Sequence, residues 1–158
     1  MSEEYDKYRY EKAKAWLEHV RELGIEVQRI NGMVESERAL LDGVRGIDYT
    51  REYVGGSRDL PDVANIVDRL FDHIREYTAS LAAYIDERTR AAQALEGLED
   101  PIERRAITEH YLMGRTWEQV RTGLGFSWQG MMTLRRRAIL SAYDVTPAGW
   151  RDPIPPAL

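Results

Sequence analysis

The sequence predicts an all-α protein, in which a long antiparallel helical hairpin is followed by a C-terminal three-helix helix-turn-helix module. Three observations in the 158-residue chain support this fold class. Apolar residues recur at three-four spacing along two long stretches. Capping signals mark the starts of short helices from Asp100 onward. The balance of charge also changes sign near the same point, which suggests separate tasks for the two parts.

The first long helix is predicted from about Glu4 to Asp42, where the chain has no proline. Gly24 and Asn31-Gly32 weaken the pattern, since each glycine costs about 1 kcal/mol relative to alanine. A bend near residue 32 would be compatible with this. The apolar positions form a coiled-coil-like seam at Leu17, Val20, Leu23, Val27, Ile30, Val34 and Leu41.

The second long helix follows a connector at about 43–60, which holds four glycines and loses the apolar rhythm. Pro61 suits the start of a helix. Each helix would have about 38 residues and span about 57 Å, so residues 1–98 are expected to form the hairpin. The apolar stripe of the second helix is wide, and we expect a second copy to cover it in a homodimer. The stripe comprises Val63, Ile66, Leu70, Phe71, Ile74, Tyr77, Leu81, Ala82, Tyr84, Ile85, Ala91, Leu95 and Leu98.

Residues 99–143 show the starts and ends of three short helices. Asp100, Pro101 and Glu103 form a capping box with a first-turn proline, and Gly114 should end that helix. Further starts and turns are marked by Thr116 with Gln119, by Gly123 and Gly125, and by Ser127. Residues 144–158 contain four prolines and are expected to form an extended tail.

Composition narrows the classes of function. The chain has no cysteine, and no apolar run is long enough to cross a bilayer. The acidic start "MSEEYDKY" does not resemble a signal peptide, so a cytoplasmic protein without a membrane partner is expected. His19, His73 and His110 lie apart, so no metal site is expected. Because no paired carboxylates, nucleophile motif or phosphate loop occur, we expect neither an enzyme nor a bound cofactor.

Charge is unevenly distributed over a chain whose net charge is −5. Residues 1–99 contain 14 Lys and Arg against 21 Asp and Glu, whereas residues 100–143 contain seven arginines against four acids. The acidic total argues against general affinity for nucleic acid, but the C-terminal part has a positive charge of three.

A helix-turn-helix over residues 114–140 would place one face of its second helix in the major groove of double-stranded DNA. If Met131, Leu134 and Ala138 face inward, the 100° step per residue turns another set outward. Arginine and glutamine suit base edges, and arginines beside them suit phosphates. The predicted DNA-binding residues are Gln129, Met132, Thr133 and Arg136 on the outward face, Arg135 and Arg137 on its flanks, and Arg115 and Arg121 on the first helix.

A second interpretation uses the same residues differently. An arginine triplet often forms only a solvated surface. Trp128, Met132, Ile139 and Leu140 are apolar positions off the inner face, and they could pack on the hairpin or bind another protein. The chain would then be a protein-interaction module whose helix-turn-helix is structural.

The stretch "LEDPIERRAITEHYLMGRTWEQVRTGLGFSWQGMMTLRRRAIL" resembles the helix-turn-helix of region 4 in sigma-70-type factors. It is more similar to phage-encoded late-gene transcription regulators of the RinA and ArpU kind, in which an N-terminal helical segment precedes that module. The resemblance covers residues 1–143 and implies a DNA-binding phage or prophage regulator that acts with RNA polymerase. Matching elements are the helix start at 98–101, Tyr111 before Gly114, residues 117–120, the turn at 124–127, and Met131, Leu134, Arg137 and Ala138.

Overall fold

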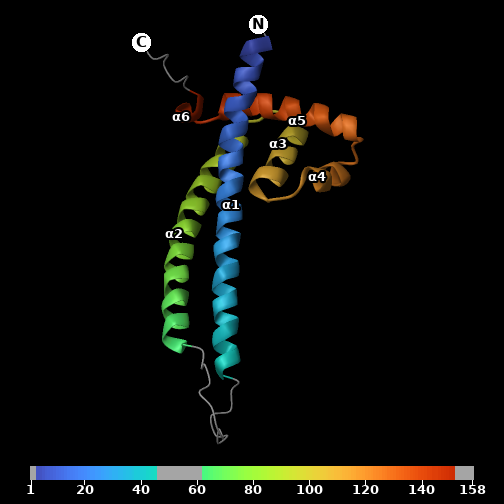
Figure 1. The fold of residues 1–158 in the computed structure, drawn as a ribbon. Coiled ribbons are helices and arrows are strands. Elements are labelled where there is room, and N and C mark those ends of the chain that lie inside the picture. The colour runs from blue at the N-terminus through green and yellow to red at the C-terminus, as the bar shows by residue number, and fades with distance from the viewer. Residues whose placement is uncertain (1–2, 46–61, 152–158) are drawn as a thin grey trace, which may run out of the picture. The chain divides into compact units, whose positions relative to one another are not determined.

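The computed structural model describes residues 3–45 and 62–151, and within these ranges it is helical with no strand (Figure 1). The all-α prediction is therefore confirmed for the part described. None of the described helices is long and apolar enough to cross a membrane. The elements are α1 (Glu3–Arg45), α2 (Val63–Leu95), α3 (Pro101–Ile107), the π-helix η1 (Thr108–Leu112), α4 (Trp117–Leu124), α5 (Trp128–Ala142), the 3₁₀-helix η2 (Tyr143–Val145) and α6 (Ala148–Arg151).

Helix α1 is continuous from its first to its last residue, through both Gly24 and Gly32. Packing along a buried apolar stripe outweighs the weak helix propensity of two glycines in so long a helix. The predicted connector starts later than expected, because α1 continues to Arg45; residues 46–61 lie outside the described ranges.

The described chain divides into two compact units, residues 3–25 with 84–151 and residues 26–45 with 62–83. This division does not coincide with the predicted boundary near residue 98. The ends of α1 and α2 nearest the C-terminal helices belong to the same unit as those helices.

The unit of residues 26–83 is an antiparallel pair formed by the second half of α1 and the first part of α2. Val27, Ile30 and Val34 are buried, in agreement with the predicted seam, and Ile66 is buried on α2. The carboxylate of Glu37 lies 3.6 Å from the guanidinium of Arg69 and 3.8 Å from the ring of His73. Arg29 pairs with Glu76 across the same two helices at 3.9 Å.

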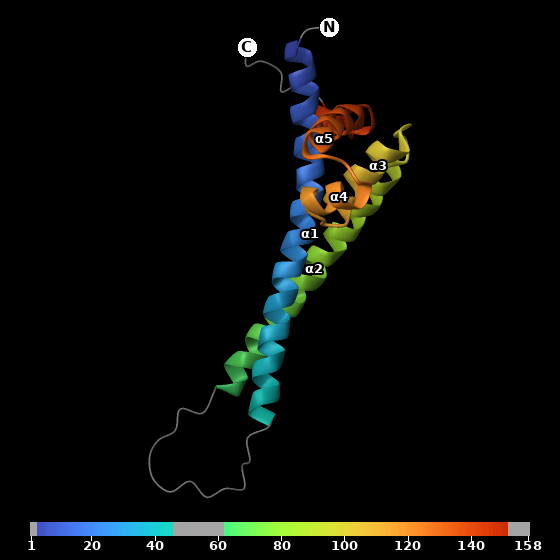
Figure 2. The same cartoon turned by 90° about the vertical axis from the view of Figure 1, so that its right-hand side faces the viewer.

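The other unit has a main core to which four parts of the chain contribute. In both Figures 1 and 2, α5 lies against the N-terminal part of α1. The buried members are Ala13, Trp16, Leu17 and Val20 of α1, Ala91 and Leu95 of α2 with Leu98 just after it, Ile107, Tyr111 and Leu112 of the α3–η1 segment, and Ala138, Ile139 and Ala142 of α5. Helices α3 and α5 thus pack against α1 through a shared core. This core determines the position of α5, which carries the candidate site described below.

The expected extended tail is wrong for residues 144–151, which form η2 and α6. Pro147 lies just before α6, where a missing N–H does no harm, and the other three prolines of the tail lie beyond the described residues. Trp150 packs against the main core. The hydroxyl of Tyr8 donates a hydrogen bond to the carbonyl of Arg151, which ties this segment to the start of α1.

Candidate nucleic-acid interface

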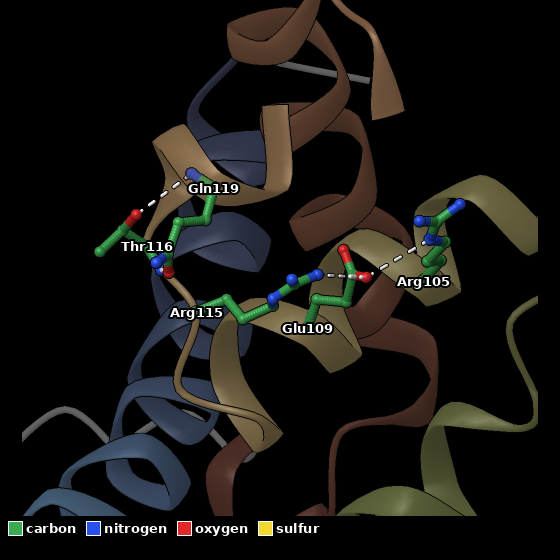
Figure 3. A network of polar contacts seen from close by, with 5 residues as sticks. All are labelled: Arg105, Glu109, Arg115, Thr116 and Gln119. Carbon is green, nitrogen blue, oxygen red and sulfur yellow. Dashed lines mark hydrogen bonds and ion pairs between the residues drawn. The ribbon is translucent and has the colours of Figure 1, made fainter. Parts of the chain in front are cut away.

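The ends of α4 and the start of α5 are determined by the capping residues expected from the sequence. The Thr116 hydroxyl accepts a hydrogen bond from the Gln119 N–H at 3.1 Å, and the Gln119 side chain accepts from the Thr116 N–H at 2.9 Å (Figure 3). Gly125, at φ +74°, ends α4 in the left-handed conformation that favours glycine. The Ser127 hydroxyl then accepts from the Gly130 N–H at 3.1 Å and starts α5.

A second, smaller core holds α3, α4 and α5 together. Its buried members are Ala106, Val120, Met131 and Leu134, with the partly buried Trp117, Leu124 and Phe126 packed around them. The expected inner face of α5 is therefore buried: Met131 and Leu134 in this core, and Ala138 in the main core.

The outward face of α5 is exposed at all four predicted positions, namely Gln129, Met132, Thr133 and Arg136. The Thr133 hydroxyl donates to the Gln129 carbonyl at 3.1 Å. Its hydrogen is thereby used within the helix, and its methyl group remains as the distinctive feature it offers to a ligand.

The apolar residues that favoured the second interpretation fall into different environments. Ile139 is fully buried in the main core, and Leu140 is partly buried. Trp128 and Met132, by contrast, are 58% and 45% exposed. Core packing thus accounts for one of the four residues, Leu140 is only partly covered, and two remain at the surface of α5.

Two of the predicted phosphate-binding arginines pair with carboxylates that are themselves almost buried. Arg137 donates to Glu103 at 2.7 Å and lies 3.6 Å from Asp100. Arg115 pairs with Glu109 at 3.1 Å, and Arg105 approaches the same carboxylate from the other side at 3.4 Å (Figure 3).

Arg121 pairs with Glu118, with 3.0 Å between Nε and Oε2, and it donates to the carbonyl of Phe126 at 3.0 Å. Each of the four acids in residues 100–143 therefore has an arginine partner. Arg136 has no ion-pair partner among the described residues. The local positive charge of this region is thus concentrated on fewer side chains than the sequence suggests.

Arg135 lies in a different environment from the flanking position expected for it. Its guanidinium lies 5.0 Å from the ring centroid of Trp117, a cation–π contact, and the side chain is partly buried. Part of this arginine's role is therefore to pack α5 against the start of α4.

His110 belongs to the same cluster and was not expected there. Its ring stacks on Trp117 with centroids 4.0 Å apart, and Nδ1 lies 2.7 Å from the carbonyl oxygen of Arg115. Burial lowers the pKa of His110 to about 4, so the ring is neutral at pH 7 and Nδ1–H donates to that carbonyl. The only sequence signal was its position seven residues before Trp117, which does not by itself predict a contact.

The π-helix η1 was also missed. The Met113 N–H donates to the Thr108 carbonyl at 3.0 Å, one residue further back than in an α-helix. The carbonyl of Leu112 accepts hydrogen bonds from Tyr84 at 3.3 Å and Arg88 at 3.2 Å. These tertiary bonds stabilise the irregular turn, and a periodic pattern cannot indicate them.

An open groove of about 1170 Å³ separates the start of α1 from the outer side of α5. A smaller hollow of about 420 Å³ lies at the first turns of α5, near Gln129 and Thr133. The large groove is lined by Glu3, Lys7, Tyr10, Glu11 and Lys14 from α1 and by Met132, Thr133, Arg135, Arg136, Arg137 and Leu140 from α5.

Comparison of the chain with protein-family models, with curated proteins and with solved structures gave no match. In residues 3–45 and 62–151, no three His, Asp or Glu side chains are placed to hold a metal ion. The candidate site is therefore described by its own geometry: an exposed polar face on α5, held by two cores, beside a groove with basic walls.

Proposed function

We propose that the protein is a DNA-binding transcription regulator of phage or prophage type, in which α4 and α5 act as a helix-turn-helix on double-stranded DNA alongside RNA polymerase. The observation that supports this most is the outer face of α5. Gln129, Met132, Thr133 and Arg136 are exposed together, while the opposite face of α5 is buried against α4 and α1. A helix that enters the major groove needs this combination of a fixed inner side and a free outer side.

Each exposed residue suits a feature of the major groove. The Gln129 amide matches adenine N6 and N7, and the Arg136 guanidinium matches guanine O6 and N7. Thr133 and Met132 present apolar groups that suit a thymine methyl. Thr133 does so because its hydroxyl hydrogen is engaged by the Gln129 carbonyl.

A protein-interaction module is the second candidate. Trp128 and Met132 together expose a large apolar surface at the start of α5, and aromatic residues and methionine are enriched in protein interfaces. In that case Trp128→Glu would abolish complex formation with a protein partner, and the chain would have no affinity for duplex DNA even at low salt.

The distinguishing experiment is a titration of the full chain with a random-sequence duplex pool at several salt concentrations. The duplexes bound by the wild type and by each single variant would then be isolated from the pool and sequenced. Gln129→Ala and Arg136→Ala should each relax the selected sequence at one position, by about 1–3 kcal/mol per bidentate contact. Arg75→Ala is the matched control, because Arg75 is an exposed arginine of α2 that pairs with its neighbour Asp72 at 2.7 Å. No retardation of any duplex at about 50 mM salt would refute the proposal.

We also propose that the protein forms a homodimer. Phe71 and Ile85 are exposed on α2, where single large apolar side chains would be better covered by a second copy. Light scattering should give twice the 18.3 kDa chain mass. Phe71→Glu should return that mass toward one chain. Arg90→Ala should not, because Arg90 is exposed on the side of α2 opposite the apolar stripe. A monomer at tens of micromolar wild-type protein would contradict this part.

A further inference from the structure

The groove between α1 and α5 has a wall that the helix-turn-helix proposal does not use. Lys7 and Lys14 stand seven residues apart on α1, which places them on the same side of the helix and about 10.5 Å apart along its axis. Both line the groove, opposite Arg135 and Arg136 of α5. The basic side chains therefore come from two elements that are distant in the sequence.

The balance of charge in the groove is positive. Five of its lining side chains are Lys or Arg and two, Glu3 and Glu11, are acidic. Lys14 pairs only loosely with Glu18, at 3.7 Å with both side chains partly exposed to solvent, so it can exchange that partner for another anion at little cost. Arg137 is the lining cation whose partner, Glu103, is nearly buried.

The α1 wall is held rigidly with respect to α5. Trp16 and Leu17 of α1 share the main core with Ile139 of α5. The other side of the same stretch is fixed by contacts to the segment after α5: Tyr8 donates to the Arg151 carbonyl, and Arg9 pairs with Asp144 at 3.5 Å. The groove face of α1 remains open, so an anion can enter without rearrangement of the helix backbone.

We infer that the start of α1 is a second DNA-contacting element, and that Lys7 and Lys14 bind the phosphate backbone of the duplex whose major groove α5 occupies. This inference rests on the proposed function. The charge of the groove and its continuity with the exposed α5 residues Met132, Thr133 and Arg136 favour a nucleic-acid backbone over an acidic peptide. Phosphates on both walls would fix the orientation of α5 in the groove without specifying bases.

The test compares the salt dependence of duplex binding by full-length variants. Neutralising one phosphate contact lowers the slope of log K against log salt by about 0.9. Lys7→Ala with Lys14→Ala should therefore lower it by about 1.8, which reduces the affinity ratio between 50 and 200 mM salt about tenfold. Selected base sequences should not change. Lys12→Ala is the control, because the Lys12 ammonium lies over the Tyr8 ring at 5.6 Å and does not line the groove.

Charge changes of the opposite sign provide a second measurement. Glu3→Gln with Glu11→Gln removes the two acids of the groove and should strengthen binding while steepening the salt dependence. Circular dichroism checks that every variant is as helical as the wild type. If Arg136→Ala weakens binding but the double lysine variant behaves like Lys12→Ala, the inference is overturned and the proposed function stands. If the wild type binds no duplex yet retains a poly-glutamate peptide through Lys7 and Lys14, both are overturned.

Discussion

Replacing Leu17 of α1 with alanine should loosen α5 as much as α1. Leu17 is fully buried in the main core, where it shares a cluster with Tyr111 of η1 and Ile139 of α5. If the stability of the C-terminal helices depends on this core, a cavity in α1 must destabilise residues more than a hundred positions away in the sequence. The substitution therefore tests whether the proposed DNA-binding helices fold independently.

The magnitude follows from the burial of Leu17. Truncating a fully buried leucine to alanine costs about 3–5 kcal/mol, because the transfer free energy and the cavity both count. A domain is stable by only about 5–15 kcal/mol. The loss should lower the midpoint of urea unfolding, and it should accelerate amide exchange of α5 about a hundredfold or more, at about 1.4 kcal/mol per tenfold.

Amide hydrogen exchange followed by NMR separates the possible outcomes. Leu40→Ala is the matched control, since it makes the same chemical change in the same helix at an exposed residue, and it should shift stability by no more than about 0.5 kcal/mol. In Leu17→Ala, the amides of Val20 and Ile139 should accelerate together. Acceleration at Val20 with unchanged exchange at Ile139 would refute the shared core and make residues 99–143 an independent domain.

Two further predictions concern stability. Gly125→Ala should destabilise the protein by about 1–2 kcal/mol, because φ is +74° at that residue. Gly32→Ala should instead stabilise the protein by up to about 1 kcal/mol, since Gly32 lies in the middle of a helix with open space around it. Urea unfolding of the two variants checks this, and equal effects on stability would contradict it. As pH falls from about 6.5 to about 4, the unfolded state binds a proton that folded His110 does not, so stability should fall by about 3 kcal/mol. His110→Phe, which keeps a ring against Trp117, should flatten that decline, and an unchanged pH profile would count against the buried neutral histidine.

The elements of the fold that could be predicted are those whose signals are local. Capping residues such as Thr116, Gly125 and Ser127 act through atoms within a few residues, and all three have the predicted roles. The seam on α1 and the inner face of α5 follow from helical periodicity. The grouping of α1 with α5 could not be derived in this way, because nothing in the periodicity indicates which apolar face meets which.

For the candidate site, the positions of the exposed residues could also be predicted from a local pattern, but the pairing of its charged side chains could not. The outward positions of α5 follow from the 100° step and are exposed as expected. Local spacing places Glu118 beside Arg121, but it cannot indicate the partner of Arg137, since Glu103 lies 34 residues earlier in the sequence. The groove is formed in part by Lys7, which is more than a hundred residues from α5 in the sequence. The helical structure of the tail is stabilised by the packing of Trp150 against the main core. Neither contact can be inferred from a local pattern.

Burial of the acidic partner decides which arginines a phosphate can take over. Glu118 is 60% exposed, so solvent screens its pairing with Arg121, and a phosphate can take over that partner at little cost. Glu103 is only 7% exposed, and leaving a buried charge unpaired costs about 3–5 kcal/mol. A phosphate contact in exposed solvent does not offset that loss, so Arg137 should remain with Glu103 when DNA binds.

The salt dependence of duplex binding should therefore rank the arginines by the exposure of their partners. Arg121→Ala should lower the slope by about 0.9, the value for one phosphate, because a phosphate can replace its exposed partner Glu118. Arg137→Ala should leave the slope almost unchanged, and its effect should appear instead as a lower midpoint in urea unfolding, because Glu103 then remains buried without a cation. A loss of slope in Arg137→Ala equal to that in Arg121→Ala would show that the buried pair opens on binding. The helix start at Asp100, which shares Arg137 at 3.6 Å, would then be part of the DNA-binding surface.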